Sequence, residues 1–281
     1  MLFLPHQNIH GSTLHVVYLK FYDFNKIFIL PAFNIYYFCC QAMKKYLYIS
    51  LLFIAGCSAF EVTTSDLECI DSLYYLKGTN KLYTGVTTDY YPNKQKSLYY
   101  NWKNGKKDGN TAAWYQNGQQ EFTGFYKEGE KEGEFLGWYE DGTLAAKRIY
   151  SKSIENGEWI LWYSNGKFRE KGVYIMGKRD GKWEWYYENG AKWIEATFKN
   201  GLENGLWTAW YDNGQKREEV NYMNGKRDGL WCEWYSNGQM MSKGLYSMGD
   251  EQGNWYTWHE DGKPRSEIFY EMGIEKSRKD W

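Results

Sequence analysis

The sequence is poor in the residues on which most enzymes and metal sites depend. It has 281 residues with only 4 histidines, 5 cysteines and 4 prolines, and beyond Cys57 the one histidine is His259. His259 occupies a repeat position that is otherwise aromatic, so it needs no catalytic explanation. No phosphate-binding loop, dinucleotide-binding fingerprint or metal-ligand spacing occurs. We therefore expect a protein that is not an enzyme and that holds neither a metal nor a cofactor.

The chain also lacks an excess of either charge and a conventional aliphatic core. Lys and Arg number 34 against 35 Asp and Glu, which gives a formal net charge of −1. Nucleic-acid-binding domains carry a basic patch or stripe, so we expect no nucleic-acid partner. Aromatic residues make up 20% of the chain although the mean hydropathy is −0.73. Trp and Tyr must therefore supply much of the apolar surface.

A repeat of 24 residues organises the chain from residue 74 to residue 281. Each unit has an aromatic pair, and in nearly every unit Asn-Gly or Asp-Gly begins three residues after the first aromatic residue. The aromatic pairs are Tyr90-Tyr91, Trp114-Tyr115, Trp138-Tyr139, Trp162-Tyr163, Tyr186-Tyr187, Trp210-Tyr211, Trp234-Tyr235 and Trp258-His259. A fixed period of this length indicates an array in which each unit packs on its neighbours.

Each unit is predicted to be a β-hairpin. Asn-Gly between alternating, aromatic-rich runs is a strong hairpin signal, because Gly adopts a positive φ without steric cost. The pattern Tyr-x-Asn-Gly-Lys fits a three-residue loop with Gly in the left-handed conformation. A second turn is marked by Gly177 and, four residues later, by Gly181, with counterparts in the other units. The charged run Lys178-Arg179-Asp180, like Lys106-Lys107-Asp108 and Lys226-Arg227-Asp228, is expected in that second turn.

These features predict an all-β fold for residues 74–281. The expected architecture is an elongated single-layer twisted antiparallel sheet of about eight tandem 24-residue hairpins. A sheet of one layer encloses no interior, so no concave pocket is expected.

The segment before the repeats has the layout of a lipoprotein signal peptide. Residues 43–56 hold two lysines, a short apolar run and a small-residue ending before Cys57, which is typical of a secretory signal. Ile54-Ala55-Gly56-Cys57 is similar to a bacterial lipobox, and this similarity implies cleavage before Cys57 and lipidation of its thiol. The alternative is an ordinary membrane anchor over residues 28–56.

The remaining segments follow from the signal peptide. Residues 1–42 are predicted to be an upstream over-extension of the reading frame, with Met43 as the true start. Residues 57–73 are predicted to be the lipidated cysteine and a polar tether. We expect a location in the bacterial cell envelope, anchored by lipid to the outer membrane or cell surface. A chain that keeps its first 56 residues would instead be cytoplasmic.

The pattern Gly-x-Trp-x-x-Trp-Tyr-x-Asn-Gly, as in residues 229–238, resembles the MORN-repeat proteins and more closely the bacterial MORN-variant repeat. The resemblance covers roughly residues 74–276. It implies successive hairpins that pair edge to edge in one long antiparallel sheet, and no shared chemistry. Some bacterial proteins with this repeat are labelled YwqK-family antitoxins, which implies an antitoxin or immunity role as one alternative.

Three functions are open at this point. The first is a non-catalytic scaffold that binds a protein partner, the second a module that binds carbohydrate or peptidoglycan, and the third an antitoxin. If a patch binds, the candidates are rings of the central units; the alternative is that these rings only cover the sheet. The candidate residues are Trp183, Trp185, Tyr187, Trp207, Tyr211, Trp231 and Tyr235.

Overall fold

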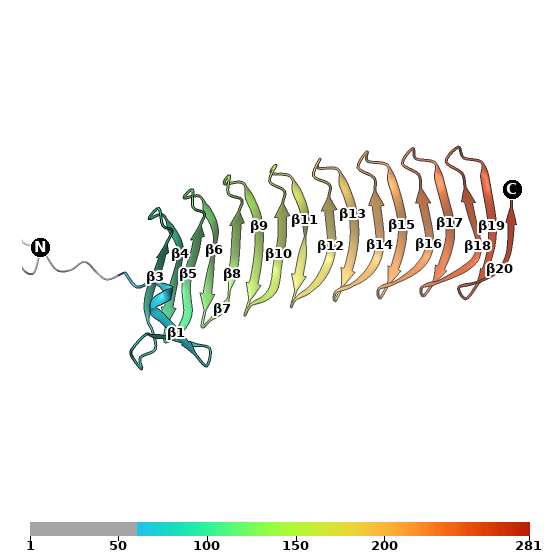
Figure 1. Cartoon of the computed structure of the whole chain (residues 1–281). Coiled ribbons are helices and arrows are strands. Elements are labelled where there is room, and N and C mark those ends of the chain that lie inside the picture. Colours follow the sequence, from blue (N-terminus) through green and yellow to red (C-terminus); the bar gives the residue numbers. More distant parts are fainter. Residues whose placement is uncertain (1–60) are drawn as a thin grey trace, which may run out of the picture. The chain divides into compact units, whose positions relative to one another are not determined.

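The computed structural model describes residues 61–281 (Figure 1). The predicted over-extension, signal peptide and lipidation of Cys57 lie outside the described residues. The elements are η1 (Thr64–Asp66), β1 (Leu67–Ile70), β2 (Leu73–Leu76), β3 (Gly85–Tyr90), β4 (Lys96–Lys103), β5 (Lys106–Trp114), β6 (Gln120–Lys127), β7 (Glu130–Lys131), β8 (Gly133–Trp138), β9 (Leu144–Ser151), β10 (Ile154–Trp162), β11 (Phe168–Ile175), β12 (Lys178–Tyr186), β13 (Lys192–Lys199), β14 (Leu202–Trp210), β15 (Lys216–Met223), β16 (Lys226–Trp234), β17 (Met240–Ser247), β18 (Asp250–Trp258), β19 (Pro264–Glu271) and β20 (Ile274–Asp280).

Strands β3 to β20 form one long antiparallel sheet in which each strand pairs with its neighbours along the chain. Within the described part of the chain, β3 pairs only with β4 and β20 only with β19, so the sheet is open and ends at these two strands. Strands β7 and β8 both pair with β6 and share one position in the sheet. The predicted all-β array of tandem hairpins is confirmed.

The first turn of each unit is a three-residue loop, as predicted. In the central unit the Tyr187 amide donates to the Ala191 carbonyl at 2.9 Å, and the Gly190 amide donates to the Tyr187 carbonyl at 2.8 Å. Gly190 has φ 88°, a conformation that costs glycine little. The loop glycine therefore allows the chain to reverse its direction between the two strands.

The second turn is shorter than the sequence suggested. It has two residues, Met176 and Gly177, with φ 49° and 76°, and two positive φ values define the type I′ turn that matches the twist of the flanking strands. Gly181 lies outside this turn and inside β12, where the register with β11 shifts. Its φ of 67° forms a β-bulge.

The charged runs lie in strands, not in the second turn as predicted. Lys178-Arg179-Asp180 was expected in the turn, but it begins β12, and Lys178 pairs with Ile175. The runs at Lys106 and Lys226 begin β5 and β16 in the same way. A two-residue turn leaves no room for them, so these side chains project from strands.

Hydrogen bonds at the loops and at the turns, the two ends of every hairpin, join each unit to the next. At the three-residue loops, Asn213 Nδ2 donates to the Ser236 carbonyl at 2.8 Å. At the two-residue turns, the Gly225 amide donates to the Glu203 carbonyl at 2.8 Å. These bonds connect positions 23 and 22 residues apart. Contacts of this kind couple nearest neighbours only.

The two ends of the sheet differ. At the first end, the Thr88 amide donates to the Val62 carbonyl at 2.9 Å and the Thr64 amide to Asp89 Oδ1 at 2.7 Å. Residues 61–66 therefore cover the edge of β3, and η1 and β1 lie inside the segment predicted as a tether. At the other end, every residue of β20 is exposed. Its charged side chains suit an edge that must not recruit another strand.

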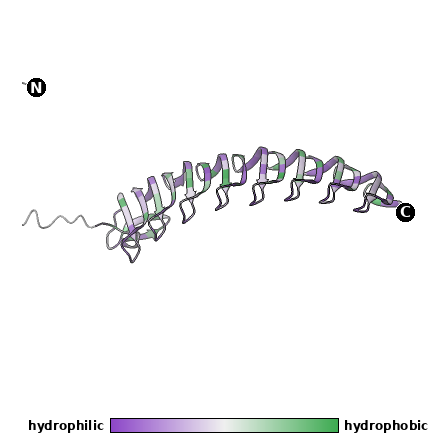
Figure 2. Ribbon diagram, turned by 90° about the horizontal axis from the view of Figure 1, so that it is seen from above, coloured by the Kyte–Doolittle hydropathy of each residue, from purple (hydrophilic) through white to green (hydrophobic). Residues whose placement is uncertain are grey.

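The buried aromatic side chains lie on one side of the sheet, which we call the aromatic face. Its rings are Tyr100, Trp102, Tyr126, Phe135, Tyr150, Trp159, Tyr174, Trp183, Trp185, Phe198, Trp207, Tyr222, Trp231, Tyr246, Trp255 and Tyr270. The Trp183 and Tyr174 rings are 4.9 Å apart, nearly perpendicular at 80°, a favourable aromatic arrangement. Figure 2 shows that the sheet is curved and carries both hydrophobic and hydrophilic residues along its length.

Rings become buried in one layer by lying over small residues of the preceding strand. A Cβ atom on Gly172 would fall 2.2 Å from the Trp183 ring, and one on Gly244 would fall 2.1 Å from the Trp255 ring. The indole therefore rests directly on the glycine backbone. Trp183 has no exposed surface at all.

Candidate binding surfaces

The other side of the sheet, which we call the charged face, carries a central row of mixed side chains. Register places these residues side by side: Tyr99, Ala112, Thr123, Leu136, Lys147, Ile160, Lys171, Glu184, Glu195, Thr208, Glu219, Cys232, Lys243, Tyr256 and Glu267. The two faces therefore offer different chemistry to a partner.

The predicted tryptophans lie on the aromatic face. Trp183 is 0% exposed and Trp231 is 9% exposed, whereas Trp185 and Trp207 are partly buried. The Trp185 indole donates to Glu170 at 2.9 Å. Trp183 presents no surface to a ligand in this arrangement, and its role is to fill the core.

The predicted tyrosines lie at the loop edge. Their hydroxyl groups donate to main-chain carbonyl groups one unit further along, at 2.8, 2.8 and 2.9 Å, in the pairs Tyr187 to Trp210, Tyr211 to Trp234 and Tyr235 to Trp258. The seven candidates therefore form two groups with internal roles rather than one site. Contact of their remaining exposed surface with a partner stays a prediction.

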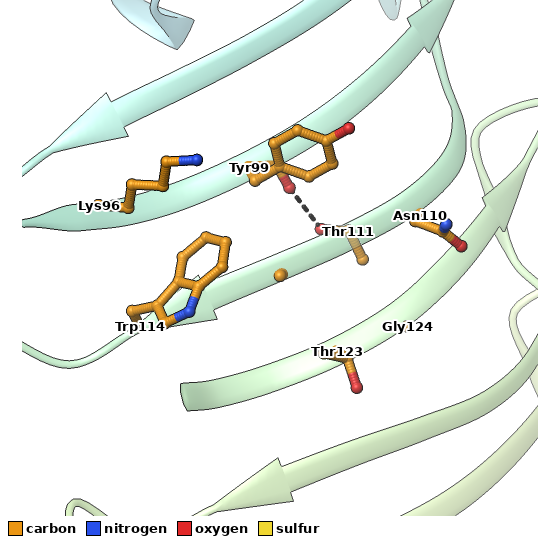
Figure 3. A pocket seen from close by; sticks show the side chains of 8 residues that line it. Lys96, Tyr99, Asn110, Thr111, Trp114, Thr123 and Gly124 are labelled. Carbon is orange, nitrogen blue, oxygen red and sulfur yellow. Dashed lines mark hydrogen bonds between the residues drawn. The ribbon is translucent and has the colours of Figure 1, made fainter. Parts of the chain in front are cut away.

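The charged face is hollowed over β4 to β6, contrary to the expectation that the sheet has no pocket. This first hollow has a volume of about 390 Å³ and is lined by Lys96, Tyr99, Asn110, Thr111, Ala112, Trp114, Thr123 and Gly124. Figure 3 shows Tyr99 and Trp114 on neighbouring strands beside it. Ala112 and Thr123 are small at positions that hold Glu184 and Glu195 three units later, and this leaves the space.

Hydrogen bonds hold the walls of the first hollow. Thr111 Oγ1 donates to the Tyr99 carbonyl at 3.0 Å (Figure 3). Asn101 Nδ2 donates to the Asn110 carbonyl at 2.8 Å and to the Tyr99 hydroxyl at 3.2 Å. The Tyr99 ring is therefore fixed at the side of the hollow.

A second hollow lies on the aromatic face over β6 to β9. Its volume is about 240 Å³, and its lining includes Phe122, Tyr126, Lys131, Phe135, Gly137, Ala146, Arg148 and Tyr150. The sequence signal for both hollows was a departure from the repeat toward small residues. Such a departure is visible only once the strand register is known.

A network of ion pairs crosses the charged face at β11 to β13. Glu184 accepts from Lys171 and Lys192, each at 2.9 Å, and Lys182 lies 3.1 Å from Glu195. Burial raises the pKa of Glu184, but the bonds from Lys171 and Lys192 outweigh it and bring the pKa from 4.5 down to about 2. The carboxylate is therefore charged across the physiological range.

The aromatic face holds two neighbouring carboxylates in β15 and β16. Glu218 accepts from the Trp231 indole at 2.7 Å and from Arg227 at 3.0 Å, and it pairs in register with Glu233. Burial, and then the charge of Glu218, raise the pKa of Glu233. The Glu233 carboxyl group therefore takes up a proton more readily than an isolated glutamate does.

Residues 61–281 contain two free cysteines and no candidate metal centre. No group of three or more His, Cys, Asp and Glu residues there could hold a metal ion. Cys69 is free and exposed, Cys232 is free and buried, and burial raises the pKa of the Cys232 thiol. Among the described residues, no helix is long and apolar enough to cross a membrane.

Comparison with known families identifies the repeat. The model of the MORN repeat variant matches six consecutive segments, namely residues 131–152, 155–176, 179–200, 203–224, 227–248 and 251–272. Residues 131–272 are an array of MORN-variant repeats. Each MORN-variant repeat contains the bulge, the three-residue loop and the second strand. The hairpins β3–β4 and β5–β6 continue the array toward the N-terminus, with the same loop bonds at Tyr91 and Tyr115.

Wider comparisons add little. No curated protein matches the chain. One similar solved structure is described as "Crystal Structure of TcdB2-TccC3-Cdc42", with 11% identity, coverage of 70% of this chain and 13% of that chain, and a TM-score of 0.17. This chain therefore corresponds to a small part of that protein's length. A TM-score of 0.17 is too low to show that the two folds are the same.

Proposed function

We propose that the MORN-variant array is a non-catalytic scaffold that binds a partner protein. The observation that carries this proposal is a row of half-exposed apolar side chains on the charged face, which we call the leucine row. Its members are Leu206, Leu230, Leu245 and Phe269, with exposed fractions of 49, 45, 48 and 43%. Exposed apolar surface that recurs on successive units favours a protein interface.

Strand register places the leucine row along one line from β14 to β19, which Asn221 of β15 and Asn254 of β18 interrupt. Leu230 pairs with Leu245 across β16 and β17, and Leu206 and Phe269 occupy the matching positions in β14 and β19. Polar side chains such as Lys243 and Glu267 flank the row, as in the polar rim of an interface.

Photo-crosslinking in the cells that make the protein tests this function. A photoreactive residue at position 230 or 245 is expected to capture one protein, whereas the same residue at Glu188, in an exposed loop, is not. The double substitution Leu230→Ser and Leu245→Ser should remove capture at Leu206 without changing the melting temperature. Absence of any specific adduct along the leucine row would reject the scaffold proposal.

We further propose that this scaffold is a lipid-anchored envelope protein. The support is the sequence Ile54-Ala55-Gly56-Cys57 after an apolar run, which resembles a lipobox. Intact mass and membrane partition of the native protein should show an acylated chain that begins at Cys57, and Cys57→Ala should abolish acylation. A soluble, unmodified chain that keeps residues 1–56 would reject the anchor and favour a cytoplasmic location.

A carbohydrate ligand is the second candidate, because the first hollow has suitable walls. Rings of Tyr99 and Trp114 beside polar atoms of Lys96, Asn110 and Thr123 are what a sugar that stacks on an aromatic ring requires. Pull-down with peptidoglycan should then succeed with the native chain and fail with Trp114→Ala. The matched control is Trp234→Ala at the same repeat position. Equal retention of both variants would exclude the hollow.

The antitoxin role stays a prediction from the family resemblance. No feature of the described residues favours it over the scaffold function. Co-purification with the product of a neighbouring gene, and relief of that product's toxicity, would be its test.

A further inference from the structure

The second hollow exists because two facing residues on the aromatic face are small. Gly137 of β8 pairs with Ala146 of β9. The corresponding pairs elsewhere are larger, namely Asp89 and Leu98, Ala113 and Phe122, Leu161 and Glu170, Trp185 and Ile194, Ala209 and Glu218, Glu233 and Ser242, and Thr257 and Ser266.

The fold itself does not require glycine at position 137. A Cβ atom there would make only ordinary contacts, 3.7 Å from the Ala146 Cβ and 3.7 Å from the Glu121 carbonyl oxygen. This differs from Gly172, on which an indole rests. The space beside Gly137 is therefore available rather than occupied by the core.

Arg148 introduces a cation at a position where every other unit has an uncharged residue, Tyr100 in the first unit and a small or aliphatic residue in the rest. It pairs with Phe135 and Trp159, and its guanidinium carbon lies 4.6 Å from the Trp159 ring centre. Its counterparts in the other second strands are Tyr100, Gly124, Gly172, Ala196, Val220, Gly244 and Ile268. The Arg148 Nε atom is buried and has no hydrogen-bond partner, an arrangement that costs stability.

Lys131 lies at the same hollow and also lacks an acidic partner. Its Nζ atom is 4.8 Å from the Tyr150 ring centre and 5.3 Å from the Phe135 ring centre. No carboxylate among residues 61–281 lies within 4.0 Å of Lys131 or Arg148. Lys147 precedes Arg148 in β9 and lies on the charged face, where it contacts two carboxylates at 3.4 and 2.9 Å.

We propose that the second hollow binds a carboxylate of the partner protein. Arg148 and Lys131 donate to the carboxylate, and the rings of Phe122 and Phe135 contact the carbon chain that carries it. A guanidinium group binds a carboxylate strongly because charge assists the hydrogen bonds. The proposal rests on the scaffold function and specifies the chemistry of its partner.

Size and surroundings restrict the source of the carboxylate. A space of about 240 Å³ admits one residue and not a folded element. The residue is either a Glu or Asp beside an apolar neighbour, or the C-terminal residue of the partner. Both sources present the same group to Arg148.

The direct test follows the Nε–H signals of the arginines by NMR in the full chain. N-acetylphenylalanine is expected to shift the Arg148 signal in a saturable way, whereas N-acetylphenylalaninamide, which lacks the carboxylate, leaves it unchanged. The Arg227 signal is the internal control, because that Nε already donates to Tyr222 at 3.4 Å. The peptide acetyl-Phe-Glu-amide separates a side-chain carboxylate from a terminal one. No shift of Arg148 with any carboxylate, or an equal shift with the amide, overturns the proposal.

Two substitutions that follow the repeat make the test quantitative. Arg148→Val reproduces Val220, and Gly137→Leu reproduces Leu161, so both variants should fold like the native chain. Each should weaken carboxylate binding about 10- to 100-fold, as expected for loss of a charged hydrogen bond or of the space. Unchanged affinity in either variant overturns the proposal.

Failure of this proposal differs from failure of the scaffold function. Partner capture along the leucine row that persists in the double variant Arg148→Val and Gly137→Leu, with no carboxylate binding by the native chain, removes the carboxylate site and leaves the scaffold. Carboxylate binding at Arg148 without any captured protein counts against the scaffold and assigns the site to a small ligand.

Discussion

The Tyr187 hydroxyl donates a hydrogen bond to the Trp210 carbonyl oxygen at 2.8 Å, 23 residues along the chain. Seven successive loops make this bond, from Tyr91 to Tyr235. It joins the loop of one unit to the first strand of the next. Units of the array therefore depend on one another for stability.

Removal of one such hydroxyl should weaken the array. Tyr211→Phe leaves the Trp234 carbonyl without its donor and is expected to lower the free energy of unfolding by about 0.5–1.5 kcal/mol. Urea unfolding measures the change. Tyr256→Phe is the control, because that hydroxyl contacts only the exposed Asn254 side chain, and equal losses in the two variants would contradict the role of the loop tyrosines.

Two glycines on the aromatic face should respond oppositely to alanine. Gly172→Ala places a methyl group 2.2 Å from the Trp183 ring and should cost about 1–3 kcal/mol by overpacking. Gly137→Ala meets only ordinary contacts and should stabilise the strand by about 0.5–1 kcal/mol, since glycine loses more conformational entropy on folding. Thermal unfolding measures the stability of both variants. A Gly172→Ala variant as stable as the native chain would show that the indole can move.

The two-residue turns contain a position that asparagine should improve. Met176 has φ 49°, and Asn200 and Asn224 have φ 54° and 52° at the same repeat position. Asparagine tolerates this left-handed conformation better than methionine. Met176→Asn should raise stability by about 0.5–1 kcal/mol, and the reverse change Asn224→Met should lower it by a similar amount. Changes of the same sign would contradict this reason.

One loop lacks a bond that its neighbours make. Asn165 Nδ2 donates to the Glu188 carbonyl at 2.8 Å, whereas Asp141 has no amide to donate to the next unit. Asp141→Asn keeps the acceptor for the Thr143 amide, now at 2.8 Å, and adds a donor. We expect a gain of about 0.5–1.5 kcal/mol in urea unfolding. Asn165→Asp should have the opposite effect.

The Glu184 network should make stability depend on pH in the acid range. The pKa of this carboxyl is lowered from 4.5 to about 2 in the folded chain, so its contribution is complete above pH 4.5 and is lost as the pH falls toward about 2. Glu184→Gln should cost about 1 kcal/mol at neutral pH after solvent screening. The difference from the native chain should shrink below pH 4.5.

Urea midpoints measured from pH 7 down to pH 2 would show this narrowing. Glu188→Gln, in an exposed loop, is the control and should match the native chain throughout. A constant difference between Glu184→Gln and the native chain would mean that Glu184 acts through packing rather than charge.

The sequence predicted the array because its signals are local and repeated. Asn-Gly loops and alternating aromatic residues predict a hairpin in every unit. The fixed period predicts that equivalent positions of successive units lie side by side. Gly181 was misplaced because a glycine at a bulge and a glycine at a turn both require a positive φ and look the same in sequence. Strand register alone tells them apart.

The hollows and the buried rings depend on contacts between strands. Gly137 and Ala146 are nine residues apart in sequence but face each other across β8 and β9, so the space between them appears only in the folded sheet. The burial of Trp183 likewise depends on Gly172 in the preceding strand. Such contacts lie beyond what composition and period can state.

The bonds that join the units at the loops and at the turns have a consequence for the length of the protein. Because each bond connects equivalent positions of adjacent units, the gain or loss of 24 residues at a turn would restore every bond. The change would move whatever lies beyond it by about 10 Å, the width of two strands. Duplication or deletion of whole units can therefore lengthen or shorten the sheet in fixed steps of about 10 Å, without a change in any contact inside the remaining units.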